Sequence, residues 1–401
     1  MSVTLAQNRG GERVLDLFIV AGDISGDDLG GKLMLALTDK LGARVNFRGV
    51  GGVAMDTAGL QRLFPTSDIA VMGILPVIAN LPRLLNRIGR TVDAIVSNPP
   101  DALVIIDSPD FTHRVARQVR RQLPNLPVID YVSPSVWAWR PGRARRMRPY
   151  VDHILALLPF EPQAHRDLGG PDCTYVGHPL IERLPDLHPN AGETLRRETA
   201  PPVVLVLPGS RPNEVARLLP VFCETINRVQ QNLGEIEVII PAVAHLAQRI
   251  SEQTASWSFR PRIVVGEAEK YAAFRQARAA LAASGTVTLE LALAHVPVVV
   301  AYKVSKLEEM IARRLVKTKW MSLPNIILGE AACPEFLQEA ANPESLAKVL
   351  QDLIEEGEPR RRQLKALMRM EKLMYLDNGE RPSERAARVV IEAIAAGKAQ
   401  S

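Results

Sequence analysis

Short apolar runs alternate with longer amphipathic segments along the whole chain, and this alternation limits the possible folds more than any other feature. The apolar runs have the length of strands, whereas the segments between them have helical periodicity. Strands that are each followed by a helix predict parallel sheets with helices on both faces. The expected strands are 14–21, 45–50, 102–106, 128–132, 153–157, 174–176, 203–207, 237–241, 263–265, 279–283 and 296–302. The expected helices include 28–41, 81–98, 111–123, 162–168, 343–356, 359–375 and 381–396.

A stretch rich in proline and polar residues, 184–202, separates two such series. Because 401 residues suffice for two domains, we expect an α/β protein with two doubly wound Rossmann-like domains facing a cleft. The expected domains are 1–184 and 200–365, followed by C-terminal helices over 366–401 that either return to the first domain or are exchanged in a dimer. Residues 313–325 are expected to form a loop. Ligands of such sheets bind beyond the carboxyl ends of the strands.

Composition excludes several classes of protein. Three cysteines, far apart and without a C-x-x-C pair, argue against disulfides, zinc and a redox dithiol. No apolar run precedes the first strand, so we expect a cytoplasmic protein without a secretory signal. The apolar segment 69–82 contains one glycine and two prolines and is shorter than the roughly 20 residues of a membrane-spanning helix.

The first expected strand ends in a glycine-containing turn. Gly22 allows a tight turn and close approach of a ligand, while Asp23 follows it, and Ser25 and Asp27 can cap a helix that begins near residue 28. The spacing is not G-x-G-x-x-G, so a dinucleotide site fits poorly. A capped strand-to-helix turn without any ligand is the simpler alternative.

A candidate general base follows the strand 102–106. Asp107 lies at its carboxyl end, where partial desolvation raises the proton affinity of a carboxylate and suits it to accept a proton from a hydroxyl. Asp110 is more simply explained as a helix N-cap. The D-x-x-D spacing could suggest a metal, but no further acidic cluster supports one.

Aromatic and basic residues follow the strand 128–132. Ser133, Trp137 and Arg140 lie in a segment with two tryptophans, which are suited to stacking on a sugar, to a lipid interface or to packing against their own domain. Five arginines between residues 140 and 148 suit an anionic membrane, a phosphorylated lipid or nucleic acid, or form a solvated helix start. His178 either bonds a ligand or has a structural role.

Two turns in the second half predict a phosphate site. Arg211 follows Pro208-Gly209-Ser210, and its guanidinium can hold a diphosphate. Ser284, Gly285 and Thr286 supply N–H and hydroxyl donors at a helix start, and Glu290 one turn later can accept hydrogen bonds from two ribose hydroxyls. The polar motif Ser322-Leu323-Pro324-Asn325 strengthens this prediction.

Together these segments resemble the lipid-A-disaccharide synthases, which are inverting glycosyltransferases with two Rossmann domains (GT-B). The resemblance runs from about residue 17 to residue 376 and is most specific at 132–140 and around Met72. It is also carried by 22–27, 49–52, 70–74, 107–111, 158–161, 177–178, 207–211, 283–290 and 322–325. The family usually has glutamate where this chain has Asp23, which puts a direct catalytic role for that position in doubt.

The resemblance implies transfer of 2,3-diacylglucosamine from its UDP derivative to the 6-hydroxyl of 2,3-diacylglucosamine 1-phosphate, giving a β-1,6 disaccharide and UDP. Asp107 matches the essential aspartate of the family, and Arg211, Glu290 and Asn325 match residues tied to UDP binding or activity. It implies no cofactor, no metal and no nucleic acid.

The implied partners are the two lipid substrates, the cytoplasmic face of the inner membrane, and a second copy of the chain with exchanged C-terminal segments. Residues 69–85, apolar and followed by arginines, could seat acyl chains, or could be a core helix with a basic face.

Two rival interpretations remain from the residues alone. A UDP-sugar epimerase, or a glycosyltransferase with a soluble acceptor, would leave the apolar segment after residue 69 and the tryptophan–arginine segment unexplained. A peripheral membrane protein or a nucleic-acid-binding protein would leave Asp107, Arg211 and Glu290 unexplained.

Overall fold

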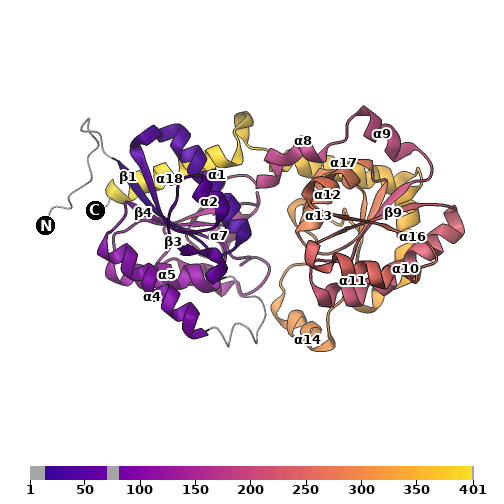
Figure 1. Ribbon diagram of the computed structural model, residues 1–401, viewed down its shortest axis with the longest axis horizontal. Coiled ribbons are helices and arrows are strands. Elements are labelled where there is room, and N and C mark those ends of the chain that lie inside the picture. The colour runs from indigo at the N-terminus through magenta and orange to yellow at the C-terminus, as the bar shows by residue number, and fades with distance from the viewer. Residues whose placement is uncertain (1–13, 70–80, 400–401) are drawn as a thin grey trace. The chain divides into compact units, whose positions relative to one another are not determined.

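The computed structural model describes residues 14–69 and 81–399 and divides the chain into two compact units (Figure 1). Unit 1 comprises Met1–Pro179 and Leu376–Ser401, and unit 2 comprises Leu180–Tyr375. Each unit is built on one sheet in which all recorded strand pairs are parallel. The two doubly wound α/β units confirm the predicted fold class.

Unit 1 contains a seven-stranded sheet in the order β3-β2-β1-β4-β5-β6-β7. Its strands are β1 (Leu15–Ala21), β2 (Val45–Gly51), β3 (Gln61–Pro65), β4 (Ala102–Ile106), β5 (Val128–Tyr131), β6 (His153–Ala156) and β7 (Asp172–Tyr175). Its helices are α1 (Ile24–Leu41), α2 (Val53–Thr57), α4 (Leu81–Ser97), α5 (Pro109–Gln122), α6 (Gly142–Met147), α7 (Glu161–Asp167) and α18 (Pro382–Ala399).

Alternate residues of β1 point to opposite faces of this sheet, and each face has its own core. Leu17 and Ile19 pack in a cluster that includes buried residues of α1 and α18. Phe18 and Val20 pack on the other face in a cluster that includes residues of α4 and α5. The last helix, α18, lies beside α1 (Figure 1), so the end of the chain completes the core of unit 1.

Unit 2 contains a six-stranded sheet in the order β10-β9-β8-β11-β12-β13. Its strands are β8 (Val203–Leu207), β9 (Glu237–Ala242), β10 (Arg262–Val265), β11 (Ala279–Ala283), β12 (Val298–Tyr302) and β13 (Glu335–Leu337). Its helices are α8 (Leu184–Leu187), α9 (Ala191–Glu198), α10 (Pro212–Leu233), α11 (Ala244–Thr254), α12 (Glu267–Gln276), α13 (Thr286–Leu293), α14 (Lys306–Leu315), α15 (Leu323–Leu328), α16 (Pro343–Ile354) and α17 (Glu358–Met374).

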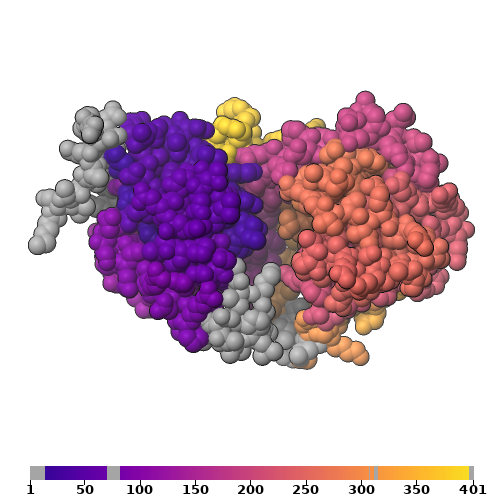
Figure 2. Space-filling model, viewed as in Figure 1, coloured from indigo at the N-terminus to yellow at the C-terminus, as the bar shows by residue number. Residues whose placement is uncertain are grey.

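The central strands of unit 2 are apolar throughout because helices cover both faces of the sheet. Every residue of β8 and β11 is buried. Helices α10, α11 and α16 contribute buried residues to one core cluster, in which α10 packs against α16. Figure 2 shows the surface of unit 2, where the atoms coloured orange lie.

The expected separator 184–202 is not a linker. It contains α8 and α9, which contact α12 and belong to unit 2. Its prolines suggested a break, yet proline is compatible with the first turn of a helix, where Pro185 lies in α8. Helix α9 begins with a capping box, in which Asn190 and Glu193 each accept a hydrogen bond from the backbone N–H of the other.

Other boundaries also differ from the expected ones. The chain passes from unit 2 back to unit 1 after Tyr375, rather than at residue 366, so α17 lies wholly within unit 2. The expected loop 313–325 is replaced at its two ends by the last residues of α14 and the first residues of α15. Two edge strands, β3 and β13, and the short helices α2 and α6 were not expected.

No helix among residues 14–69 and 81–399 is both long and apolar enough to cross a membrane. Most of the segment 69–85, including the expected site residue Met72, lies outside the described residues.

Candidate active site

Four of the candidate segments lie at the switch points of the two sheets, where the strand order reverses direction. In unit 1 this point lies between β1 and β4, and in unit 2 between β8 and β11. The turn with Gly22 follows β1 and Asp107 follows β4, whereas Arg211 follows β8 and Ser284 follows β11. Ligands of doubly wound sheets bind at such points because the loops diverge there and leave a crevice.

Unit 2 contains a cavity of about 580 Å³ at its switch point. The turn after β8 contributes Gly209, Ser210 and Arg211, and the segment after β11 contributes residues 284–287 and Glu290. The ends of β9 and β10 and the start of α12 complete the lining. Five of the six predicted donor-site residues therefore come together in one cavity: Arg211, Ser284, Gly285, Thr286 and Glu290.

The start of α13 offers unpaired donors to this cavity. Gly285 is the N-cap of α13 and has no side chain to cover the helix end. Within the described part of the chain, no acceptor is recorded for the backbone N–H groups of Thr286 and Val287. Free N–H groups at the positive end of a helix bind anions.

The turn before α10 differs from this arrangement because a carboxylate already occupies it. Oε2 of Glu214 accepts hydrogen bonds from the backbone N–H groups of Ser210 (3.2 Å) and Arg211 (3.3 Å). Oε1 of Glu214 accepts one from Nη1 of Arg211 at 2.8 Å, although the Arg211 side chain remains 70% exposed. Glu214 was expected to be a first-turn helix residue, and it is one that satisfies the donors of this turn.

Glu290 is held by two residues that sequence reasoning did not identify. Nζ of Lys270 donates to both carboxylate oxygens, at 2.8 and 3.0 Å, and the hydroxyl of Tyr271 donates to Oε1 at 3.2 Å. Lys270 lines the cavity together with Glu290. The sequence offered only the position of Lys270 near the start of the helix that follows β10 as an indication of its role. Many solvent-exposed lysines have such a position.

Asn325 does not line the cavity. It is fully buried; its amide nitrogen donates to the Cys333 carbonyl and to Glu335, and its amide oxygen accepts from the Cys333 N–H. Glu335 also accepts from the backbone N–H of Met321 at 2.9 Å, and the Met321 carbonyl accepts from Oγ of Ser284 at 3.0 Å. Asn325 is thus connected to the turn after β11 only indirectly, through the hydrogen bonds of Glu335 and Met321.

In unit 1, Asp107 lies on a left-handed turn that packs against Gly22. Asp107 and Ser108 have φ values of 51° and 43°, a conformation that side chains other than glycine rarely adopt. A Cβ atom added to Gly22 would lie 2.0 Å from Cβ of Ser108, so only glycine fits there. The expected close approach at Gly22 is therefore made by the chain itself.

The surroundings of Asp107 favour its protonated form. Burial raises the pKa of Asp107, and the nearby carboxylates of Asp23 and Asp130 raise it further, against a hydrogen bond from the Ser108 N–H at 2.6 Å that lowers it. A carboxylate in this setting accepts a proton more readily than an exposed one.

The other residues of the first turn mainly shape the backbone. Asp23, not Ser25 or Asp27, is the N-cap of α1, which begins at residue 24 rather than 28, and its Oδ1 accepts from the Gly26 N–H at 2.7 Å. Ser25 is exposed on the first turn of α1. The buried carboxylate of Asp27 accepts from three backbone N–H groups at residues 52, 54 and 55 at the start of α2.

The aromatic segment after β5 packs largely against unit 1. Nε1 of Trp137 donates to Glu161 at 3.1 Å, and burial raises the pKa of Glu161 to about 7. Oγ of Ser133 is buried and lies 2.8 Å from Nε2 of His165. Arg140 is exposed, and its guanidinium lies over the Trp139 ring at 4.5 Å.

His178 is partly buried at the end of the β7 segment. Burial, with the nearby Lys32 ammonium as a smaller cause, lowers the pKa of His178 to about 4. Its imidazole is therefore neutral at physiological pH and can accept a hydrogen bond at one nitrogen and donate one at the other.

Possible metal ligands come together at one place among the described residues. His188, His295 and Glu371 have ligand atoms within 4.8 Å of one another. Oε2 of Glu371 lies 2.6 Å from Nε2 of His295 and 3.2 Å from Nε2 of His188, and Tyr375 donates to its other oxygen. Burial alone would raise the pKa of Glu371, but these partners lower it overall, so the carboxylate already has cationic or polar partners. None of the three residues lines the cavity at the switch point.

Two doubly wound units, each with polar residues at the switch point of its sheet, define a protein of the GT-B fold class. Solved structures of the same fold include the MurG protein of Acinetobacter baumannii, with 14% identity and a TM-score of 0.55 over 95% of this chain and 99% of that one. A UDP-N-acetylglucosamine 2-epimerase of Neisseria meningitidis bound to UDP-GlcNAc has 12% identity and a TM-score of 0.56 over 95% of this chain and 100% of that one.

The chain belongs to the lipid-A-disaccharide synthase family. The family described as lipid-A-disaccharide synthetase matches residues 17–391. A lipid-A-disaccharide synthase of Nitrobacter winogradskyi is 54% identical over 96% of this chain and 97% of its own length. One of Rhodopseudomonas palustris is 50% identical over 94% of this chain and 96% of its own length. The protein is therefore a glycosyltransferase of lipid A disaccharide synthesis.

Proposed function

We propose that the enzyme transfers 2,3-diacylglucosamine from its UDP derivative to the 6-hydroxyl of 2,3-diacylglucosamine 1-phosphate, releasing UDP and a β-1,6 disaccharide 1-phosphate. The observation that carries the proposal is the cavity at the switch point of unit 2, which is lined by the start of α13 with its free N–H groups, by Arg211 and by Glu290. The family supplies the reaction class, and the cavity supplies a place for a nucleoside diphosphate.

UDP is the expected occupant of the unit 2 cavity. The N–H groups of Thr286 and Val287 would hold one phosphate, and the exposed guanidinium of Arg211 would hold the other. Glu290 would accept hydrogen bonds from the ribose hydroxyls, with the two hydrogen bonds from Lys270 orienting its carboxylate. These donors would stabilise the negative charge that develops on the departing diphosphate.

Asp107 is the proposed general base. Its raised pKa improves its ability to take the proton from the attacking 6-hydroxyl. Attack on the anomeric carbon from the face opposite to UDP would invert its configuration. Asp23 would act on this step by raising the proton affinity of Asp107 without contacting the substrate.

Asn325 is proposed as a positioning residue rather than a ligand. Its bonds to Glu335 and Cys333 order the segment whose Met321 carbonyl accepts from Ser284. We expect Asn325→Asp to weaken UDP binding, because a second carboxylate beside Glu335 would break this network.

Membrane contact at the cytoplasmic face and a dimer with exchanged C-terminal segments are also part of the proposal. Both substrates carry acyl chains, so the enzyme must reach a lipid surface. In a single chain, α18 fills the core of unit 1, so an exchanged dimer would place α18 of one copy on α1 of the other. Light scattering and flotation with anionic vesicles measure the two properties separately.

The decisive experiment supplies both lipid substrates and follows UDP release and disaccharide formation. We expect turnover by the native enzyme in the presence of EDTA, and a loss of at least about 100-fold in Asp107→Asn. UDP affinity, measured by calorimetry, should be unchanged in Asp107→Asn and reduced in Glu290→Gln. A native enzyme that releases no UDP, or an Asp107→Asn variant with native turnover, would overturn the proposal.

A further inference from the structure

Unit 1 contains a second cavity, of about 850 Å³, between α5 and the segment 140–150. Its walls carry five arginines: Arg114 and Arg117 on α5, and Arg140, Arg143 and Arg146 before and on α6. Sequence analysis identified only the last three as neighbours, because α5 and α6 are separated by the strand β5.

These five arginines have no carboxylate partner among the residues that the structure describes. By contrast, Arg120 on the same helix is paired with Asp152. The one acidic residue in the lining is Asp110, at the start of α5, and it forms no recorded ion pair with them. Five cations facing one cavity repel one another, and an anion in the cavity would relieve this repulsion.

The floor of the cavity is built from buried polar side chains. Tyr150 and His113 are each only 5% exposed. The Tyr150 hydroxyl lies 3.3 Å from Nη2 of Arg117 and 3.2 Å from Nδ1 of His113. Nε2 of His113 lies 3.3 Å from the buried carboxylate of Asp130, which holds the imidazole in place. The floor is therefore an ordered chain of polar groups and not a gap between mobile surface side chains.

Two residues of the cavity lining closely follow the proposed general base in the sequence. Pro109 and Asp110 line it, and they follow Asp107 by two and three residues. From Pro109, the helix rise places His113 about 6 Å and Arg117 about 12 Å along α5. A ligand whose hydroxyl faces Asp107 could thus extend an anionic group towards the arginines.

We infer that this cavity binds the phosphate monoester of the acceptor sugar, with Arg117 and Arg143 as its main ligands. The inference rests on the proposed function and adds the residues that select a phosphorylated acceptor. Guanidinium groups bind phosphate through paired, charge-assisted hydrogen bonds, and the planar fork suits a dianionic monoester better than a single ammonium would. A membrane phospholipid headgroup has the same phosphate chemistry, so the experiment must separate the two sources.

The test compares Arg117→Gln, Arg143→Gln and Arg117→Lys with Arg121→Gln. Arg121 lies on α5, is exposed and does not line the cavity, so it controls for loss of one positive charge on the same helix. Three assays are run. The first measures turnover with varied acceptor, either phosphorylated or dephosphorylated. The second measures binding of the soluble probe glucosamine 1-phosphate by NMR line broadening, and the third measures binding to anionic phospholipid vesicles by flotation. Circular dichroism confirms that each variant is folded.

We expect Arg117→Gln and Arg143→Gln to raise the acceptor KM about tenfold each, with the donor KM unchanged. Their preference for the phosphorylated acceptor over the dephosphorylated one should decrease by the same factor. Arg121→Gln should have the acceptor KM and the preference of the native enzyme, and Arg117→Lys should have values between those of the native enzyme and Arg117→Gln. The NMR signals of glucosamine 1-phosphate should broaden in the presence of the native protein and should not broaden in the presence of the two Gln variants.

Unchanged acceptor KM and unchanged preference in folded Gln variants would overturn the inference while leaving the proposed function intact. Reduced binding to anionic vesicles with an intact preference would also overturn it, in favour of the phospholipid headgroup. If no disaccharide forms but glucosamine 1-phosphate binds and the Gln variants lose it, the proposed function fails while the phosphate site stands.

Discussion

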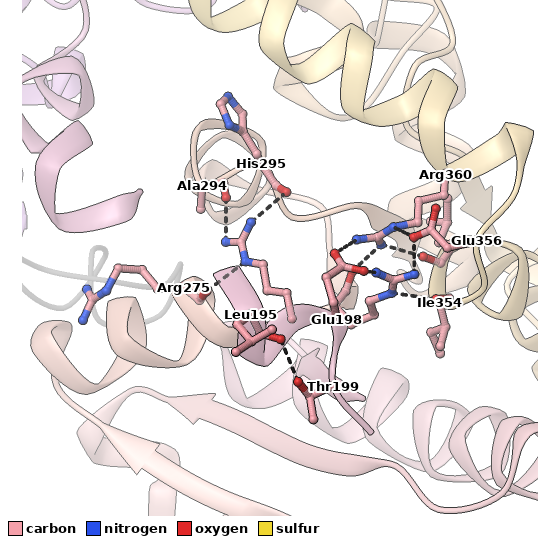
Figure 3. A network of polar contacts seen from close by, with 12 residues as sticks. Leu195, Glu198, Thr199, Arg275, Ala294, His295, Ile354, Glu356 and Arg360 are labelled. Atoms are coloured by element: carbon pink, nitrogen blue, oxygen red, sulfur yellow. Dashed lines mark hydrogen bonds and ion pairs between the residues drawn. The ribbon is translucent and has the colours of Figure 1, made fainter. Parts of the chain in front are cut away.

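Replacing Arg197 should test whether a buried guanidinium stabilises α13, the helix that follows the proposed phosphate-binding turn. Arg197 lies on α9 and is 8% exposed. It donates to the carbonyls of Phe274 and Arg275 at the end of α12, and of Ala294 and His295 just beyond the end of α13, at 2.8–3.3 Å. Figure 3 shows Arg275, Ala294 and His295 in this network. A cation at the end of two helices also interacts favourably with both helix dipoles.

The expected loss of stability follows from these four hydrogen bonds. Arg197→Met retains much of the apolar stem but removes every donor. The Phe274 carbonyl keeps a second hydrogen bond, from the Ala277 N–H at 3.2 Å, so three carbonyls lose the donor recorded for them. Removing one side of a buried charged network costs about 3–5 kcal/mol. For a unit of this size, 1 kcal/mol shifts the melting temperature by about 2–4 °C, so we expect a decrease of about 6–20 °C.

Calorimetry of Arg197→Met, Arg197→Lys and Arg361→Met provides the measurement. Arg361 has a side chain that is 63% exposed and lies 3.8 Å from Glu358, so its replacement should change stability by less than about 0.5 kcal/mol. Burial, followed by repulsion from Arg360, lowers the pKa of Arg197 to about 10, so the native side chain is charged at pH 7. If Arg197→Met had the same melting temperature as Arg361→Met, the four hydrogen bonds would contribute nothing to stability, and the reasoning would be refuted.

Three further predictions concern the turn that carries Asp107. Asp107→Asn should be inactive but at least as stable as the native enzyme at neutral pH. The pKa of Asp107 is raised in the folded state, so the ionised carboxylate lowers the stability of the native enzyme. The stability advantage of the variant should vanish below about pH 3.8, as measured by thermal melts across pH. Asp23→Asn keeps an N-cap side chain and removes a charge that raises the pKa of Asp107, so the acid limb of the pH profile of kcat/KM should move to lower pH; an unmoved limb would exclude this coupling. Gly22→Ala should lose about 1–3 kcal/mol and most activity, since its Cβ would overlap Ser108, whereas Gly89→Ala, with open space around its Cβ on α4, should not destabilise the protein.

Local sequence patterns determined the positions of the central strands. The bounds of β4, β8 and β11 match the expected ones because a parallel strand covered on both faces is a continuous apolar run with polar residues at its ends. The edge strands β3 and β13 are partly exposed, so their mixed composition gave no comparable signal. The same pattern predicted the positions of Asp107 and Ser284, because each directly follows a buried strand.

The tertiary structure decided which polar groups are free to bind a ligand. Glu214 accepts hydrogen bonds from the backbone of the turn before α10, and Asn325 is hydrogen-bonded to Glu335 and Cys333. Lys270, on another helix, donates to Glu290. Each of these contacts depends on where a side chain points once helices and strands from different parts of the chain have packed together. The sequence by itself therefore determined the two sheets and the strand ends where chemistry occurs, because apolar periodicity is local. Only the folded chain decided the partners of each charge, because hydrogen bonds and ion pairs depend on distances in space.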